Sequence, residues 1–155
     1  AIAQSAQPII SYNYGISRWD EIREARRLLL STSAAIGAVV ALLFILIPDT
    51  LVALFVDTAS KAGMIAIEGF PYFAAGIVFF ILNVAIVGYY QSVEQIRRAT
   101  LFVFMRGFLL LIPSFILLPK ALGAEGIWLA MPLAELVTTL VIVLLFTRQR
   151  LRFIR

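Results

Sequence analysis

The sequence of 155 residues contains no cysteine and no histidine, and only 14% of its residues are charged. The lack of cysteine excludes disulfides and thiolate chemistry, and the lack of both residues removes the commonest metal ligands. Residues 123–126, Gly-Ala-Glu-Gly, resemble a turn rather than a phosphate-binding loop, because no lysine or further glycine pattern follows. Arrangements of a hydrolase nucleophile are absent as well. The sequence therefore predicts no enzyme, no metal site and no cofactor.

Apolar residues make up 62% of the chain. Soluble domains are about half apolar. A soluble fold of this length would leave large apolar patches in water, whereas a lipid bilayer removes that difficulty. The net charge of +4 does not point to nucleic acid, because the basic residues stand at the ends of apolar stretches. We expect an all-α integral membrane protein, a polytopic helical bundle with the lipid bilayer as a partner.

Four apolar stretches are long enough to cross a hydrocarbon core of about 30 Å, which takes about 20 helical residues. They cover about residues 28–47, 69–90, 99–118 and 126–147. Residues 1–15 are also apolar but short, and we interpret them as the end of a helix whose beginning is missing. Since the chain starts with Ala1 rather than Met, we expect it to begin inside a longer protein.

The connections between these stretches are short, so successive helices are expected to be antiparallel neighbours. Residues 17–27 are read as a charged loop whose acidic and basic residues are spaced to pair along a helix. Pro48 ends the first complete stretch, and Asp49 or Thr50 is expected to cap a short amphipathic segment at the interface.

The basic residues of the connections orient the helices. One side of the membrane receives ten arginines from residues 17–27, residues 91–98 and the tail: Arg18, Arg23, Arg26, Arg27, Arg97, Arg98, Arg148, Arg150, Arg152 and Arg155. The opposite side receives only Lys61 and Lys120. The positive-inside rule places the arginine-rich side and the C-terminus in the cytoplasm. We expect a multi-pass protein of the plasma membrane.

Two ionisable residues, Arg106 and Glu135, lie deep within the apolar stretches, and with Asn83 and Gln7 they define a polar layer in the middle and inner half of the bundle. At 1.5 Å per residue, Arg106 lies roughly 10 Å from the cytoplasmic edge and Glu135 roughly 15 Å from either edge. An ionisable group at such depth is costly unless it meets a partner or water. Two interpretations remain open. The residues form a structural ion pair with interhelical hydrogen bonds, or they line a substrate cavity in which Glu135 couples transport to an ion.

The proline and glycine residues indicate where helices bend and where they pack closely. Pro8, Pro113 and Pro132 are expected to bend their helices, because each removes one helical hydrogen bond. A gating role for them remains a second possibility. Gly37, Gly76 and Gly88 indicate close packing between helices.

Several motifs carry a family resemblance that covers essentially the whole chain. AIAQSAQPIISYNYG, followed by a basic segment, resembles the eighth helix of multidrug and toxic compound extrusion (MATE) transporters, most closely their MepA-like branch. LFVDTAS resembles the turn after the ninth helix of that family, and GYYQSVEQIRRA resembles the end of the tenth. The run from Met105 to Leu140 resembles the eleventh and twelfth helices. The matching positions are Gln4, Gln7, Pro8, Tyr12, Asn13, Tyr14, Gln91, Arg106, Pro113, Pro132 and Glu135.

The resemblance implies a transporter of twelve helices in two lobes, with a central cavity that opens alternately to either side. This chain would then be helices eight to twelve of the C-terminal lobe, and its partner would be the missing N-terminal lobe. Such transporters export organic, often cationic, drug-like compounds in exchange for H⁺ or Na⁺.

The chain departs from the family pattern at two positions. Residues 79–83 contain no carboxylate, and Asn83 is their only polar member. Some branches carry an acidic cation ligand there, so the main ion or proton site is expected in the missing half. Glu94 stands where the family has a small glycine. Two alternatives to drug efflux remain, a flippase of lipid-linked oligosaccharides from the same superfamily and a structural membrane subunit that does not transport.

Overall fold

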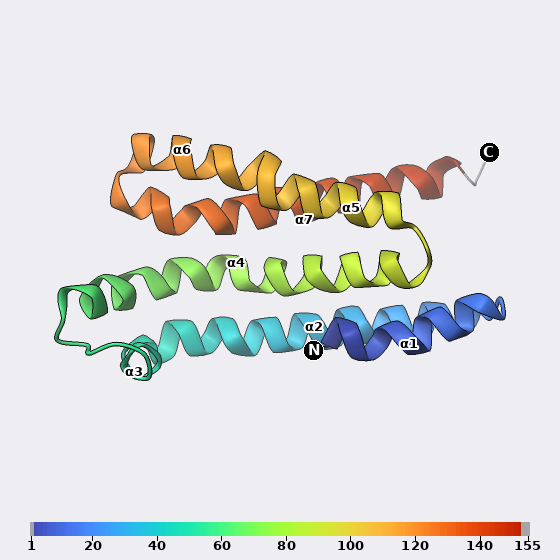
Figure 1. The fold of residues 1–155 in the computed structure, drawn as a ribbon, viewed down its shortest axis with the longest axis horizontal. Helices are drawn as coiled ribbons and strands as arrows, with labels where there is room; N and C mark the ends of the chain where they lie inside the picture. Colours follow the sequence, from blue (N-terminus) through green and yellow to red (C-terminus); the bar gives the residue numbers. More distant parts are fainter. Residues whose placement is uncertain (1, 153–155) are drawn as a thin grey trace.

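The computed structural model describes the backbone of residues 2–152 and the side chains as far as Leu145. Every element in this part of the chain is helical, which confirms the all-α prediction (Figure 1). The elements are α1 (Ile2–Gly15), α2 (Trp19–Leu46), α3 (Pro48–Ala53), α4 (Lys61–Ser92), α5 (Ile96–Phe104), the π-helical segment η1 (Met105–Leu110), α6 (Leu111–Leu122) and α7 (Ala124–Arg152). The segments α5, η1 and α6 follow one another without a break and act as a single long helix.

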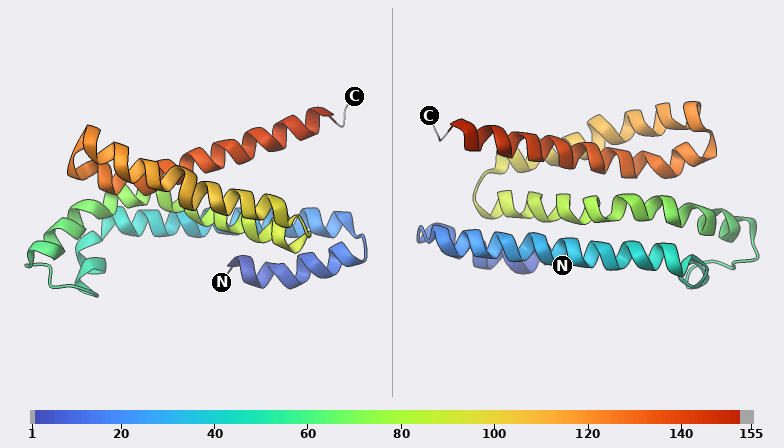
Figure 2. Two further views of the ribbon diagram at one scale, coloured as in Figure 1. Left: turned by 45° about the horizontal axis from the view of Figure 1, so that its top comes forward. Right: turned by 180° about the vertical axis from the view of Figure 1, so that it is seen from behind.

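The long helices lie in layers with α4 in the middle (Figure 1). On one side α4 packs against α1 and α2, and on the other side it packs against α5 and α7. Towards its C-terminal end α7 leaves the other helices (Figure 2). We call the end of the bundle that holds the α1–α2 and α4–α5 connections the basic end, because Arg18 and Arg97 lie there.

Four helices in the described part of the chain are long and apolar enough to cross a membrane: Trp19–Leu46, Lys61–Ser92, Ile96–Leu122 and Ala124–Leu145. Their outward surfaces carry many large apolar side chains, including Leu46, Leu109, Leu117 and Leu144, each of which is more than half exposed. Such a surface is unfavourable in water and suits hydrocarbon chains. The fold is therefore that of a helical membrane protein.

The helices begin earlier than the apolar stretches do. The second helix begins at Trp19 rather than at Leu28, and α4 begins at Lys61 rather than at residue 69. Hydropathy marks the part of a helix that lies in hydrocarbon, whereas a helix continues through polar residues as long as its backbone bonds are made. Residues 19–27 are thus part of α2 and not a loop, and Asp20 pairs with Arg23 along that helix.

The connection after α2 differs from the expected cap. Pro48 does end α2, which stops at Leu46. The N-cap position of α3 is occupied by Ile47, however, and no side chain caps it. The prediction that Asp49 or Thr50 caps this segment is wrong, because Pro48 takes the first helical position and moves the start of α3 ahead of both residues.

Glycines allow α4 to approach its neighbours closely, as the sequence indicated. A Cβ atom on Gly76 would lie 2.6 Å from the Cα atom of Pro132 in α7. A Cβ atom on Gly37 would lie 3.0 Å from the Cα atom of Val78. The contact at Gly76 leaves no room for a side chain and the contact at Gly37 is tight, so both glycines bring α4 close to the helix beside it.

Two helix ends at the basic end share one uncommon feature. After α1 and after α4, the chain reverses through a residue with a positive φ angle, Ser17 at 58° and Glu94 at 57°. After α4, the Gln95 N–H donates to the Tyr90 carbonyl at 2.9 Å, and the Glu94 N–H donates to the Gln91 carbonyl at 3.2 Å. This is the Schellman pattern, which favours glycine at the left-handed position. Glu94 therefore occupies a position where a glycine would fit without strain.

Candidate functional site

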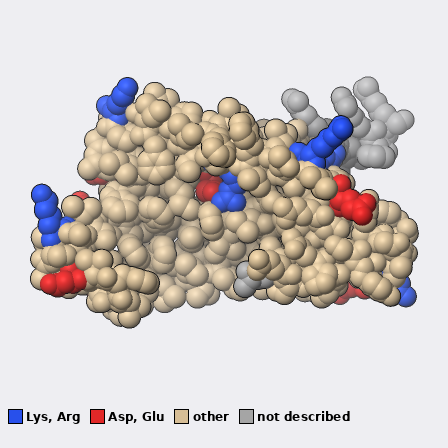
Figure 3. Space-filling model, viewed as in Figure 1, with Lys and Arg blue, Asp and Glu red and all other residues tan. Residues whose placement is uncertain are grey.

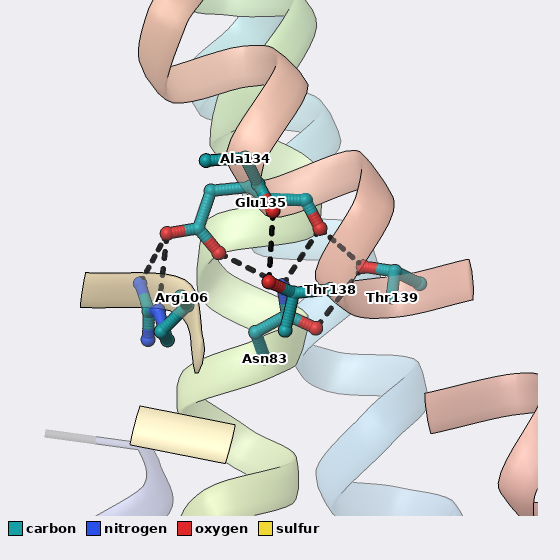
Figure 4. Close-up of polar contacts among 6 residues, drawn as sticks. All are labelled: Asn83, Arg106, Ala134, Glu135, Thr138 and Thr139. Carbon is teal, nitrogen blue, oxygen red and sulfur yellow. Dashed lines mark hydrogen bonds and ion pairs between the residues drawn. The ribbon is translucent and has the colours of Figure 1, made fainter. Parts of the chain in front are cut away.

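The structure brings together three of the four residues of the predicted polar layer. Asn83 comes from α4, Arg106 from η1 and Glu135 from α7, and their side chains meet where the three segments cross (Figure 4). Asn83 is fully buried and Glu135 is 5% exposed. We call these residues, together with Thr139, the central polar cluster.

An ion pair joins η1 to α7 within this cluster. One carboxylate oxygen of Glu135 accepts hydrogen bonds from Nε of Arg106 at 3.1 Å and from Nη2 at 2.5 Å. The Arg106 side chain is 14% exposed and the Glu135 side chain 6%, so neither charge is well screened by solvent. Burial of either charge alone would be costly, and the pair offsets most of that cost.

Asn83 satisfies the other carboxylate oxygen. Its Nδ2 atom donates to Oε2 of Glu135 at 2.8 Å and to the backbone carbonyl of Glu135 at 3.0 Å. Its Oδ1 atom accepts a hydrogen bond from the Thr139 hydroxyl, also at 3.0 Å. The amide of Asn83 thus ties α4 to α7 and completes the hydrogen bonding of the carboxylate.

The π-helical segment determines where Arg106 lies. A π-turn adds a residue to the helical repeat and commonly appears at functional sites. Pro113 stands just after η1, in the first turn of α6, and has no N–H to donate to the Leu109 carbonyl. The π-turn that carries Arg106 thus ends shortly before Pro113, and the predicted bend at this proline stays a prediction.

The Arg106 side chain also contacts an aromatic ring. Its guanidinium carbon lies 4.8 Å from the centre of the Phe80 ring, within the range of a cation–π interaction. Figure 3 shows basic and acidic atoms meeting in the middle of one face of the bundle, in agreement with this pair, whereas the other charged side chains on that face gather towards the ends.

The fourth predicted residue, Gln7, does not join the cluster. It donates from Nε2 to the side-chain oxygen of Gln91 at 3.2 Å, which links α1 to α4. Gln7 and Arg106 nevertheless line the same groove, which has a volume of about 460 Å³. Gln4 and Gln91 add further polar groups to its wall, and the rest of the wall is apolar. We call this space the glutamine groove.

The remaining family positions have mixed environments. Tyr12 is 68% exposed, and Pro8 is exposed as well. The Asn13 side chain donates to the Ile9 carbonyl within α1, and Tyr14 packs edge-on against Trp19. Pro132 is buried against Gly76. Of the signature residues, only Gln4, Gln7, Gln91 and Arg106 line the groove in the described part of the chain.

Sequence reasoning missed Thr139 and Phe80 as members of the site. Thr139 stands one helical turn after Glu135, which was an available signal, but threonine in a membrane helix is common and usually bonds its own backbone. Thr138 does so through the Ala134 carbonyl, and the Thr139 hydroxyl lies 3.0 Å from the Glu135 carbonyl in its own helix as well as from Asn83. Nothing in the sequence distinguishes Phe80 from the other apolar residues around it in α4.

The central polar cluster is electrically neutral as it stands. Both carboxylate oxygens of Glu135 already accept hydrogen bonds from protein groups, so a cation at this carboxylate would compete with Arg106 and Asn83. No group of acidic residues able to hold a metal ion occurs among the described residues.

Comparison with known proteins identifies the family. The MatE family model matches residues 1–116, which is most of the chain. The chain belongs to the MatE family. MatE proteins are cation-coupled efflux transporters and not enzymes. The match includes Arg106 and ends within α6, before the helix that carries Glu135. No curated protein and no solved structure shows significant similarity to the chain.

Proposed function

We propose that the protein exports organic, mainly cationic, drug-like compounds in exchange for H⁺ or Na⁺, and that this chain is helices eight to twelve in the C-terminal lobe of a two-lobe transporter. The observation that carries the proposal is a neutral ion pair at mid-bundle beside the glutamine groove. Glutamine amides offer hydrogen bonds without a net charge. Because Glu135 neutralises Arg106, a cationic compound in the groove meets no net positive charge.

The same observation disfavours the flippase of lipid-linked oligosaccharides. An anionic head group needs basic residues that are available to it. Arg106 is the one basic residue within the four candidate spans away from their ends, and both of its bonded nitrogens are directed at Glu135. A structural subunit without transport is disfavoured by membership in a transporter family.

The experiment is drug accumulation in cells that carry the full-length gene. In Glu135→Gln, Arg106 keeps its charge beside the groove, and we expect export of the cation ethidium to fall at least tenfold. In Arg106→Ala, Glu135 is left buried without a counter-charge, and we expect export to fall as well. The double variant Arg106→Gln/Glu135→Gln is neutral again and should recover part of the ethidium export.

Matched controls use charges outside the cluster. Glu21→Gln and Lys120→Ala remove one charge each from exposed positions at the two ends of the bundle, and both should export as wild type does. If Glu135→Gln and Arg106→Ala are present in the membrane at wild-type amounts and export ethidium equally well, the cluster has no part in transport.

We also propose that the basic end faces the cytoplasm. Its arginines outnumber the two lysines of the opposite end, as the positive-inside rule requires. Because the chain has no cysteine, single cysteines can report on each side. In a full-length background without other cysteines, a membrane-impermeant maleimide added to intact cells should label Ala121→Cys and not Gln95→Cys. The reverse result would invert the orientation.

A further inference from the structure

The connection between α2 and α4 contains three exposed apolar residues in succession. They are Leu54, Phe55 and Val56, which follow α3 directly, and their exposed fractions are 72%, 84% and 40%. No other large apolar side chain in the described part of the chain is as exposed as that of Phe55. We call these three residues the apolar turn. Such a group at the surface indicates contact with something other than water.

The two flanking helices determine the level at which the apolar turn lies. After Arg27, α2 has no charged residue. At about 1.5 Å per residue, its residues 28–46 extend about 28 Å, close to the hydrocarbon thickness of about 30 Å. The end of α2 at Leu46 therefore lies at the hydrocarbon edge.

The start of α4 lies further out than the end of α2. The first two turns of α4 contain its two charged residues, Lys61 and Glu68, and they extend about 10 Å beyond its apolar part. Figure 1 shows α4 reaching past the end of α2 here, and it shows α3 lying across the direction of the long helices. A helix with that direction at the hydrocarbon edge lies in the plane of the membrane interface.

The backbone of the apolar turn needs no water. The Leu54 N–H donates to the Leu51 carbonyl at 3.4 Å. The N–H groups of Phe55 and Val56 both donate to the Val52 carbonyl, at 2.9 and 3.0 Å. An N–H without a partner is costly in hydrocarbon, so internal pairing is a condition for entry into lipid. The apolar turn meets this condition.

Polar residues begin directly after the apolar turn. Oδ1 of Asp57 accepts a hydrogen bond from the Ala59 N–H at 3.0 Å, and the Asp57 carbonyl accepts one from the Ser60 hydroxyl at 2.6 Å. The Ser60 oxygen in turn accepts from the Gly63 N–H at 3.0 Å. The chain thus passes from apolar to polar groups within one residue, as a segment that enters lipid and returns requires.

The neighbouring surface favours lipid as the occupant. From Ala34 to Leu46, α2 carries no polar side chain, and its large exposed residues continue to Leu46 and Ile47. This helix contributes no residue to the glutamine groove, whose wall holds polar side chains. Interfaces between proteins carry hydrogen bonds and a polar rim. A surface without polar groups that continues from a membrane-spanning helix fits hydrocarbon better.

We propose that the apolar turn is a lipid anchor. Leu54, Phe55 and Val56 enter the leaflet at the end of the bundle opposite the basic end, and they hold the ends of α2 and α4 there at a fixed depth. The sequence predicts an amphipathic segment at the interface, and the anchor adds which residues enter lipid. The inference does not depend on which compound is transported.

The test places a nitroxide spin label on single cysteines of the full-length protein, in a background without other cysteines, in phosphatidylcholine vesicles. Collisions with oxygen report hydrocarbon, and collisions with a water-soluble nickel chelate report water. The labelled variants are Phe55→Cys in the anchor, Leu46→Cys as the lipid reference and Ala59→Cys as the matched control after the anchor. All three positions are exposed, so the variants should fold as wild type does.

We expect the label at residue 55 to collide with oxygen as often as the label at residue 46, and to lose nearly all collisions with nickel. The label at residue 59 should show the reverse preference. Nickel collisions at residue 55 as frequent as at residue 59 would place the turn in water and overturn the anchor. A label at residue 55 that meets neither reagent would be covered by protein, either another part of the transporter or a second copy, and would overturn it as well.

Discussion

Removal of Arg106 alone leaves the Glu135 carboxylate in an environment that cannot stabilise its charge. Both hydrogen bonds to Oε1 of Glu135 come from Arg106, and the Glu135 side chain is only 6% exposed. Breaking one partner of a buried pair costs about 3–5 kcal/mol in soluble proteins. Since Asn83 still donates to Oε2, we expect the lower end of that range, about 3 kcal/mol, for Arg106→Met.

Removal of Glu135 alone is expected to lower the free energy of unfolding by less than removal of Arg106 does. In Glu135→Met, the flexible Arg106 side chain can turn towards the basic end, because long basic side chains reach the interface from inside a bilayer. We expect a loss of about 1–2 kcal/mol, mostly from the bond that Asn83 loses to the side-chain oxygen, since its bond to the backbone carbonyl of residue 135 remains. In the double variant, both charges are replaced by apolar groups, and its stability should lie within about 1 kcal/mol of wild type.

The measurement is denaturant unfolding of the purified full-length protein in detergent, with Lys120→Met as a control at an exposed site. The free energies of unfolding of the two single variants and the double variant form a cycle. Independent sites add within about 0.5 kcal/mol. A loss in the double variant equal to the sum of the single losses would refute the ion pair as a bond between η1 and α7.

Three further predictions concern helix ends and helix contacts, and all are measured as changes in the same free energy of unfolding. Glu94→Gly should stabilise the protein by about 1 kcal/mol, because glycine adopts the left-handed conformation at this position without strain; a loss of stability would mean that the Glu94 side chain contributes a contact. Gly76→Ala should destabilise it by about 1–3 kcal/mol by forcing α4 away from Pro132. The matched change Gly107→Ala meets no atom within 4 Å, and equal losses at both glycines would argue against the close contact. Ser60→Ala should cost about 1 kcal/mol, since the Ser60 side chain caps the start of α4; no change would show that the cap is not needed.

The sequence predicts the fold class well because the bilayer imposes a simple rule. A helix that crosses hydrocarbon must be apolar over about 20 residues, so the four spans can be located without knowledge of their packing. The helix ends are less predictable, since α2 and α4 extend past the apolar stretches into charged residues such as Asp20 and Lys61. The left-handed residues Ser17 and Glu94 could not be expected from propensity, because both are unfavourable there.

The sequence predicts which residues form the site better than it predicts which of them touch one another. Arg106, Asn83 and Glu135 stand out because polar residues are rare in membrane spans. Which of them touch depends on how each helix is rotated about its own axis. That rotation is fixed by packing, for example by Gly76 against Pro132, and by the extra residue of the π-turn. The rotation of α1 likewise decides the partner of Gln7. This residue lines the groove with Arg106, but its side chain bonds to Gln91 and not to the central polar cluster.

The order of the paired residues along the chain has a consequence for membrane insertion during synthesis. Arg106 is made before Glu135, which follows 29 residues later. An unpaired arginine near the centre of a helix opposes insertion by about 2.5–3.5 kcal/mol until its partner is present. The turn between the two helices is tight, since Gly126 lies against the backbone of Leu118 and Pro119. We therefore expect the insertion machinery to retain the helix formed by residues 96–122 until α7 has been synthesised, and then to release the two into lipid as one hairpin.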